Sequence, residues 1–267
     1  MDINWIEYSD PLRLGCFIVA FIIFALAEYQ WPRKALTQKK STRWFSNIGL
    51  VFFNSLILRL ALPLLAVDAA LITNQEQWGL FNYLNTPTFL TGLLSILLLD
   101  WLIYWQHRAF HRVPLLWRLH RMHHSDQDID VTTGTRFHPI EIIISMLLKI
   151  AAIGVLGIPV EAVILFEILL NISAMFNHSN LFIPKWLDRY VRSIVVTPDF
   201  HRVHHSIHVT EMNNNYGFFL SIWDRFGNTY LVQPRDGHQE MKIGLGLFRK
   251  TREQHLDKML TQPFRKK

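Results

Sequence analysis

Five long apolar stretches constrain the fold of this 267-residue chain more than any other feature. Crossing a lipid bilayer takes roughly 20 mostly apolar residues as a helix. A helix also satisfies its own backbone polar groups, which lipid cannot do. The sequence therefore predicts an all-α, integral membrane helical bundle of four to five spans, at residues 14–30, 47–67, 88–106, 140–157 and 160–177.

The last two stretches are separated only by a short Gly157-Ile158-Pro159 linker. They form either a tight hairpin of two full spans or a shallow re-entrant pair, and the hairpin is favoured. The first stretch resembles the apolar part of a signal peptide. However, the first twelve residues carry Asp2, Glu7 and Asp10 and no Lys or Arg, whereas a signal peptide begins with positive charge. We therefore expect this stretch to be a retained span.

Composition excludes several other classes of protein. Half of the residues are hydrophobic and 18% are charged, which excludes an intrinsically disordered chain. The single cysteine, Cys16, excludes a disulfide scaffold. The formal net charge is +6, but no basic stripe with interleaved aromatic residues is present. No nucleic-acid partner is expected.

The distribution of basic residues predicts the orientation in the membrane. Of the 27 Lys and Arg residues, 24 lie in residues 31–45, 107–137 and 178–267, and none lies in the loops 68–87 and 157–160. Basic loops remain in the cytoplasm. We therefore expect five spans with the N-terminus outside and the basic segments on the cytoplasmic side.

The histidines are concentrated in the same basic segments. Ten of the 13 lie between residues 107 and 205, where they form one H-x-x-x-H pattern and two H-x-x-H-H patterns. Residues three and four apart lie on one face of a helix, so each pattern projects several imidazoles in one direction. The three patterns consist of His107 and His111, then His120, His123 and His124, then His201, His204 and His205.

Neutral imidazole is a good ligand for iron, zinc and copper. The eight patterned histidines, together with His138 and His178 at the ends of predicted spans, are too many for one ion, so the sequence predicts a dinuclear metal site. The alternative to a metal site is that histidines simply line a membrane–water interface, and this interpretation explains His208, His238 and His255. Two candidates also have local explanations: His138 precedes Pro139 and could cap a helix, and His178 could lie in a satisfied turn.

Two residues of the third predicted span are candidates to support these ligands. Asp100 and Tyr104 share a helical stripe with His107 and His111. A carboxylate at this position could accept the second ring N–H of a metal-ligating histidine and fix its tautomer. Asp100 could instead be a structural partner for a buried base.

Three further residues are candidates for the same supporting role. Glu167 and Asn171 share a stripe with His178 on the fifth predicted span. Glu167 could also pair with Lys149, because unpaired charges within a membrane are costly. Asp199 lies two residues before the third histidine pattern, where capping of the helix is the favoured interpretation.

The histidine patterns and their neighbours resemble the fatty acid hydroxylase superfamily, which includes the sterol desaturases. The resemblance covers about residues 90–230, and the alkylglycerol-monooxygenase-like branch is favoured by the sequence that follows His124. It divides the chain into N-terminal spans (1–90), a hydroxylase-like domain (91–230) and a basic C-terminal tail (231–267). The matching motifs are D-W-L-I-Y-W-Q-H-R-A-F-H from Asp100, H-R-M-H-H-S from His120, R-F-H-P from Arg136, F-N-H-S-N from Phe176, H-R-V-H-H from His201 and N-Y-G from Asn215.

The resemblance implies that all ten histidines bind a non-haem diiron centre within a cytoplasmic, histidine-rich helical cap. It also implies O₂-dependent hydroxylation or desaturation of a lipid such as a sterol, fatty acyl chain or ether lipid. Electrons would come from a separate ferredoxin, a b-type cytochrome with its reductase, or a pterin. The alternative from a different class is a histidine-rich membrane metal transporter, although a transporter usually places its ligands near the bilayer midplane.

Overall fold

The computed structural model describes residues 8–266, so Asp2 and Glu7, used above in the signal-peptide argument, lie outside the described residues. Within the described range the chain is all-α, with three isolated β-bridges and no named strand. Five helices are long and apolar enough to cross a membrane. This confirms the predicted fold class of a multi-pass helical membrane protein.

The candidate spans coincide with the predicted stretches, although the first two begin earlier and the third ends later than predicted. They are α1 (Ser9–Gln30), α2 (Lys40–Ala61), α5 (Thr88–Arg112), α7 (Pro139–Leu156) and α8 (Val160–His178). Their outer faces carry large exposed apolar side chains, as expected of surfaces that meet lipid. Examples are Ile22 and Leu26 on α1, Phe52 and Leu60 on α2, Leu93 on α5, Val155 on α7 and Leu165 on α8.

The second span differs from the prediction because it ends six residues early. Helix α2 ends at Ala61 rather than at residue 67, and α3 (Ala66–Gln75) begins after a break. Pro63 explains the break, because proline has no backbone N–H and disfavours helical geometry in the residue before it. Leu62 is accordingly extended, with φ −120° and ψ 125°.

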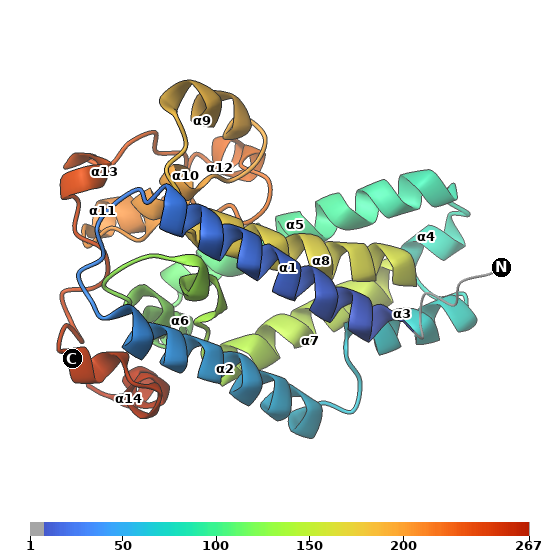
Figure 1. The fold of residues 1–267 in the computed structure, drawn as a ribbon. Helices are drawn as coiled ribbons and strands as arrows, with labels where there is room; N and C mark the ends of the chain where they lie inside the picture. Colours follow the sequence, from blue (N-terminus) through green and yellow to red (C-terminus); the bar gives the residue numbers. More distant parts are fainter. Residues whose placement is uncertain (1–7, 267) are drawn as a thin grey trace.

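The α7–α8 turn is short and well defined. Gly157 ends α7 in the left-handed conformation, at φ 70° and ψ 48°, and α8 begins three residues later. A glycine adopts this conformation without steric penalty. From this turn the two helices diverge toward the opposite end of the molecule (Figure 1). Both have the length and composition of a span.

The remaining helices gather at that opposite end and form a cap over the long helices (Figure 1). We use "cap" for these elements together. They are α6 (Pro114–His124), η1 (Val131–Thr135), α9 (Lys185–Val191), α10 (Pro198–His204), α11 (Val209–Met212), α12 (Ile222–Phe226), α13 (Gly237–Glu240), η2 (Thr251–Gln254), α14 (Leu256–Thr261) and η3 (Gln262–Phe264). The short α4 (Leu80–Tyr83) lies at the other end, beside α3.

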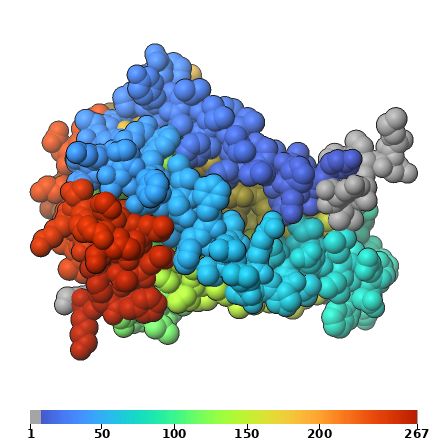
Figure 2. All heavy atoms as spheres, turned by 60° about the horizontal axis from the view of Figure 1, so that its bottom comes forward, coloured from blue at the N-terminus to red at the C-terminus, as the bar shows by residue number. Residues whose placement is uncertain are grey.

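The C-terminal segment, which the sequence analysis describes as a basic tail, packs against α2 and α6. Met259 of α14 is fully buried against Leu50 of α2 and Met122 of α6. Arg121 of α6 also donates to the backbone oxygen of Gln262. In the space-filling view this segment covers one end of the molecule next to α2 (Figure 2).

Candidate metal centre

Nine histidines converge in the cap as two adjacent groups. Within each group, the ligand atoms that the residues offer all lie within 4.8 Å of one another. Eight of the nine residues are buried, and His111 is partly buried. Group A consists of His107, His111, His120, His124 and His204, and group B consists of His123, His178, His201 and His205.

Each H-x-x-H-H pattern is divided between the two groups. His120 and His124 of α6 belong to group A, while His123 belongs to group B. On the third pattern the division is reversed, because His201 and His205 belong to group B and His204 to group A. At about 100° per residue, positions i and i+4 share a stripe while i+3 lies on the neighbouring stripe.

Prolines, and in α10 an N-capping hydroxyl group, determine where these short helices begin. Pro114 is at the first position of α6, directly after α5 ends at Arg112. Pro198 has the same place in α10, where the hydroxyl of Thr197 accepts a hydrogen bond from the Phe200 N–H. Thr197 is therefore the N-cap of α10, and the expectation that Asp199 caps this helix was wrong.

Backbone and carboxylate oxygens orient five of the nine rings through Nδ1. The Nδ1–H of a neutral imidazole donates to each oxygen, which leaves Nε2 with a free lone pair. The pairs are His107 with Tyr216 O (2.8 Å), His120 with Glu141 Oε1 (2.6 Å), His123 with Arg136 O (3.3 Å), His178 with Ala174 O (2.7 Å) and His204 with Asn214 O (2.7 Å).

The resulting lone pairs face one another. The Nε2 atoms of His107 and His120 are 3.1 Å apart, and those of His123 and His178 are 3.2 Å apart. Because each Nδ1 carries the ring proton, neither nitrogen of such a pair has a proton to donate. Two lone pairs at this separation repel each other unless a cation lies between them.

The remaining ring nitrogens also suit a metal ion. Neither ring nitrogen of His124 or His205 has a hydrogen-bond partner within residues 8–266, and the same holds for Nε2 of His111. Burying such groups without a partner is unfavourable. The donor set therefore fits two closely spaced ions that accept imidazole nitrogen.

Burial favours the neutral form, which is the form that binds metal, for five of the clustered histidines. Burial, followed by the mutual influence of neighbouring histidines, lowers the pKa of His123, His124, His201 and His205 well below the ordinary value. Burial also lowers the pKa of His204 to about 3. No protons therefore need to be displaced from these rings at neutral pH.

His138 lies apart from both groups, unlike the prediction that it joins the ligands. Its Nδ1 accepts a hydrogen bond from the Ile140 N–H, so it is the N-cap of α7, and its Nε2 lies 3.2 Å from the backbone oxygen of Leu260. Both ring nitrogens are thus engaged with the backbone. The local capping explanation weighed above accounts for this residue.

Glu141 was missed by the sequence analysis, although it makes the carboxylate–histidine contact expected of Asp100. It lies in the first turn of α7, is 4% exposed and bonds His120. The available signal was an acidic residue three positions after His138, at the same membrane side as the histidines. That contact depends on tertiary packing between α6 and α7, which spacing along the chain does not reveal.

Asp100 and Tyr104 form hydrogen bonds with residues 220–229, the segment that follows Tyr216, and make no hydrogen bond to a histidine. The Asp100 carboxylate accepts hydrogen bonds from Leu220 N (3.0 Å) and from the Trp223 indole (2.7 Å). The Tyr104 hydroxyl lies 2.9 Å from the Thr229 hydroxyl. Both contacts hold the segment that carries the Tyr216 carbonyl, the acceptor for His107.

The other predicted supporting residues also make no hydrogen bond or ion pair with the nine clustered histidines. Glu167 forms the expected ion pair with Lys149 at 2.8 Å and a second one with Arg13. Asn171 donates to the backbone oxygen of Glu167, within its own helix. Asp199 pairs with Arg33 at 2.8 Å and thereby ties α10 to the chain after α1.

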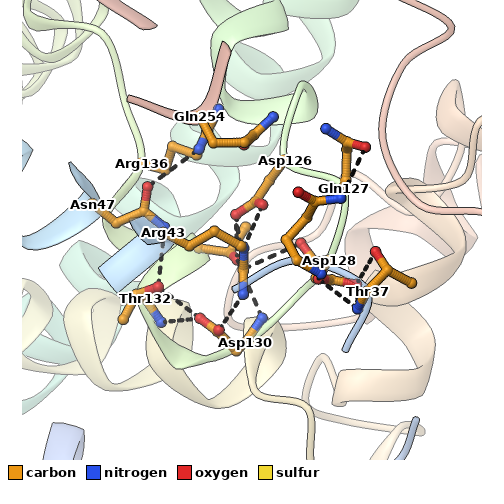
Figure 3. Close-up of polar contacts among 12 residues, drawn as sticks. Thr37, Arg43, Asn47, Asp126, Gln127, Asp128, Asp130, Thr132, Arg136 and Gln254 are labelled. Atoms are coloured by element: carbon orange, nitrogen blue, oxygen red, sulfur yellow. Dashed lines mark hydrogen bonds and ion pairs between the residues drawn. The ribbon is translucent and has the colours of Figure 1, made fainter. Parts of the chain in front are cut away.

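A buried ion network holds the loop that follows the second histidine pattern (Figure 3). The guanidinium of Arg43 bonds the carboxylates of Asp126 at 2.7 Å and Asp130 at 2.5 Å, and all three side chains are 0% exposed. Burial alone would raise the pKa of Asp126, but Arg43 and Arg136 lower it to about 2. Through Thr132 and Asn47 the network is also linked to Arg136, whose carbonyl orients His123.

A cavity of about 280 Å³ lies between the long helices and reaches the histidines. His107, His120 and His123 form part of its wall. Most of the remaining lining is apolar, and it comes from α1, α2, α5, α7 and α8. An apolar molecule that enters between the helices could therefore reach both histidine groups.

Together, the fold and the histidine groups define a class: a multi-pass helical membrane protein with a candidate dinuclear metal centre next to an apolar cavity. The family model "Fatty acid hydroxylase" matches residues 92–229, which include all nine clustered histidines. The chain belongs to the fatty acid hydroxylase family.

Several characterised proteins are similar to this chain. An ornithine lipid hydroxylase of Rhizobium tropici is 26% identical over 248 residues, covering 90% of this chain and 74% of that protein. Human alkylglycerol monooxygenase is 28% identical over 239 residues, covering 85% and 48%. A very-long-chain aldehyde decarbonylase of Oryza sativa is 31% identical over 150 residues, covering 52% and 23%.

This chain spans about three quarters of the first relative, but less than half of the other two. No solved structure matches it.

Proposed function

We propose that this protein is a membrane-bound, non-haem diiron oxidoreductase that hydroxylates or desaturates a lipid with O₂. The observation that carries the proposal is the pair of histidine groups, whose oriented Nε2 lone pairs face one another at the end of an apolar cavity. The similarity to an ornithine lipid hydroxylase and to alkylglycerol monooxygenases supports a lipid substrate.

Group A would hold one iron ion and group B the other, with His138 serving as a helix cap. When bound, the two ions would supply the activation of O₂ that attack on an unactivated C–H bond requires. The protein would contribute imidazole ligands, their fixed orientation and a largely apolar cavity next to them. Asp100 and Tyr104 would support the ligands indirectly, through the segment that carries Tyr216.

We further propose that the cap faces the cytoplasm and receives electrons from a separate donor, which could be a ferredoxin, a b-type cytochrome with its reductase, or a pterin. The cytoplasmic placement is supported by the 24 Lys and Arg residues in the segments next to the cap end of the spans. It is tested by labelling engineered surface cysteines from either side of sealed vesicles.

The central experiment is metal analysis of detergent-purified, iron-supplemented protein. We expect about two irons per chain, one for each histidine group, because imidazole is a suitable ligand for iron. The variant in which His120, His123 and His124 are all changed to Ala should lose both. One ion or none, unchanged in this variant, would refute the dinuclear centre and reopen the transporter alternative.

A further inference from the structure

Several hydrogen-bond donors on the wall of the cavity are bonded within the protein. The Ser55 hydroxyl donates to Val51 O at 2.8 Å, and the Asn171 amide donates to Glu167 O at 2.9 Å. The Thr135 hydroxyl donates to Thr132 O, also at 2.9 Å. These groups offer little to a ligand.

Three acceptor oxygens on the same wall remain unused. They are Oδ1 of Asn54, Oε1 of Gln106 and Oε2 of Glu141, which come from α2, α5 and α7. Each atom is buried and has no hydrogen-bond partner among the residues that the structure describes. Three separate helices thus direct an unsatisfied acceptor to one cavity.

The orientation of two of these acceptors is fixed by other bonds of the same side chain. The Asn54 Nδ2 donates to Phe137 O at 2.9 Å, which leaves Oδ1 as the free end of the amide. Glu141 accepts the His120 ring proton through Oε1, which leaves Oε2 free. These two side chains therefore offer acceptors, and rotation of the amide or carboxylate would break a bond already made.

A buried acceptor without a partner is unfavourable, and a ligand that supplies a donor removes that penalty. The rest of the cavity wall includes Phe17, Leu58, Ile103 and Phe110, which favour a hydrocarbon chain. The complementary ligand is therefore an amphiphile with a long apolar part and a hydrogen-bond donor near the histidines. A lipid whose only polar atoms are acceptors, such as an ether or an aldehyde, leaves all three oxygens unsatisfied.

We propose that the substrate is a lipid that carries hydroxyl or amide N–H groups close to the carbon that is oxidised, and that Asn54, Gln106 and Glu141 accept hydrogen bonds from these donors. The inference rests on the proposed lipid-oxidising function, because it assigns the cavity to the substrate. It adds a specificity rule: the protein selects donor-bearing lipids over hydrocarbon, ether and aldehyde analogues of the same length.

The test compares hexadecan-1-ol with its methyl ether, which has the same chain but no donor. Binding of each probe to the iron-supplemented protein is measured by native mass spectrometry, and O₂-dependent gain of oxygen in each probe is measured separately. We expect the alcohol to bind roughly tenfold more tightly than the ether, which corresponds to one net hydrogen bond. Equal binding, as expected if water satisfies the acceptors, would overturn the proposal.

The Asn54→Leu variant should lose most of the preference for the alcohol and retain iron, because the hydrogen bond that Asn54 makes goes to Phe137 O and not to a histidine ring. Gln106→Leu provides the same comparison from a different helix if Asn54→Leu does not fold. The matched control is Asn74→Leu on α3, which should keep the full preference. A preference retained in both cavity variants would also overturn the proposal.

The two readouts distinguish this inference from the proposed function. A binding preference that Asn54→Leu abolishes supports the inference even if neither probe gains oxygen, a result that would count against oxidation. Oxidation of both probes with no binding preference would support the oxidoreductase and refute the role assigned to the three acceptors.

Discussion

Replacement of Arg43 by Met tests whether the buried ion network holds the second histidine pattern in place. Arg43 and Arg136 balance Asp126 and Asp130 in a region where all four side chains are fully buried. The substitution removes bonds of 2.7 and 2.9 Å to Asp126 and of 2.5 Å to Asp130. It leaves one carboxylate without a compensating charge.

Breaking a buried ion pair from one side destabilises a protein by about 3–5 kcal/mol, because the remaining charge stays buried. We expect a loss of that size in the free energy of unfolding, measured by denaturant titration in mixed micelles. Iron content should fall as well, because the network is linked to Arg136, whose carbonyl orients His123. The control is Arg252→Met, which removes an exposed pair with Asp257 and should change neither quantity.

A second substitution separates lost charge balance from lost packing. Asp126→Asn in the Arg43→Met background restores the balance of charges, so the double variant should be more stable than Arg43→Met alone by more than about 1 kcal/mol, the coupling expected of contacting groups. A loss below about 1 kcal/mol in Arg43→Met, against the cost expected for an unpaired buried charge, would refute the reasoning. So would strict additivity of the two substitutions.

Three further predictions concern the metal centre and its support. Glu141→Ala should weaken iron retention about 10- to 100-fold in chelator competition, because His120 loses the acceptor that fixes its tautomer; unchanged retention would remove Glu141 from this role. Gly134→Ala should destabilise the fold by about 1–3 kcal/mol, since an added Cβ would lie 2.5 Å from Ala174 O in α8; wild-type stability on denaturation would contradict the close packing of η1 on α8. Removal of iron by a chelator should lower the thermal stability of the wild type but not that of the variant in which His120, His123 and His124 are changed to Ala, and an equal effect on both would place the bound metal elsewhere.

Local signals in the sequence were sufficient to predict the spans and most of the histidines that cluster in the structure. A span is recognised by its own composition, and H-x-x-H-H places its rings by helical geometry alone, so both were predictable without tertiary information. The early end of α2 could also have been predicted from the sequence, because Pro63 lies within the predicted span. The sequence analysis weighted apolar character above this helix-breaking residue.

The parts that were not predicted depend on contacts between distant residues. Glu141 reaches His120 across 21 positions, and Asp100 reaches Leu220 across 120. The stripe that Asp100 shares with His107 was read correctly, but the stripe does not specify what the carboxylate meets. His138 shows the converse, because its local signal, the Pro139 that follows it, indicated the helix cap that the structure shows, whereas the family resemblance implied a ligand.

The division of each histidine pattern between groups A and B links the two halves of the site thermodynamically. Helices α6 and α10 each supply ligands to both groups. An ion bound to one group would order these short helices, so the second ion would bind to a site whose conformational entropy has already been lost. Metal uptake would then be cooperative: partly metallated protein should be scarce at every iron concentration, and loss of one ion should promote loss of the other.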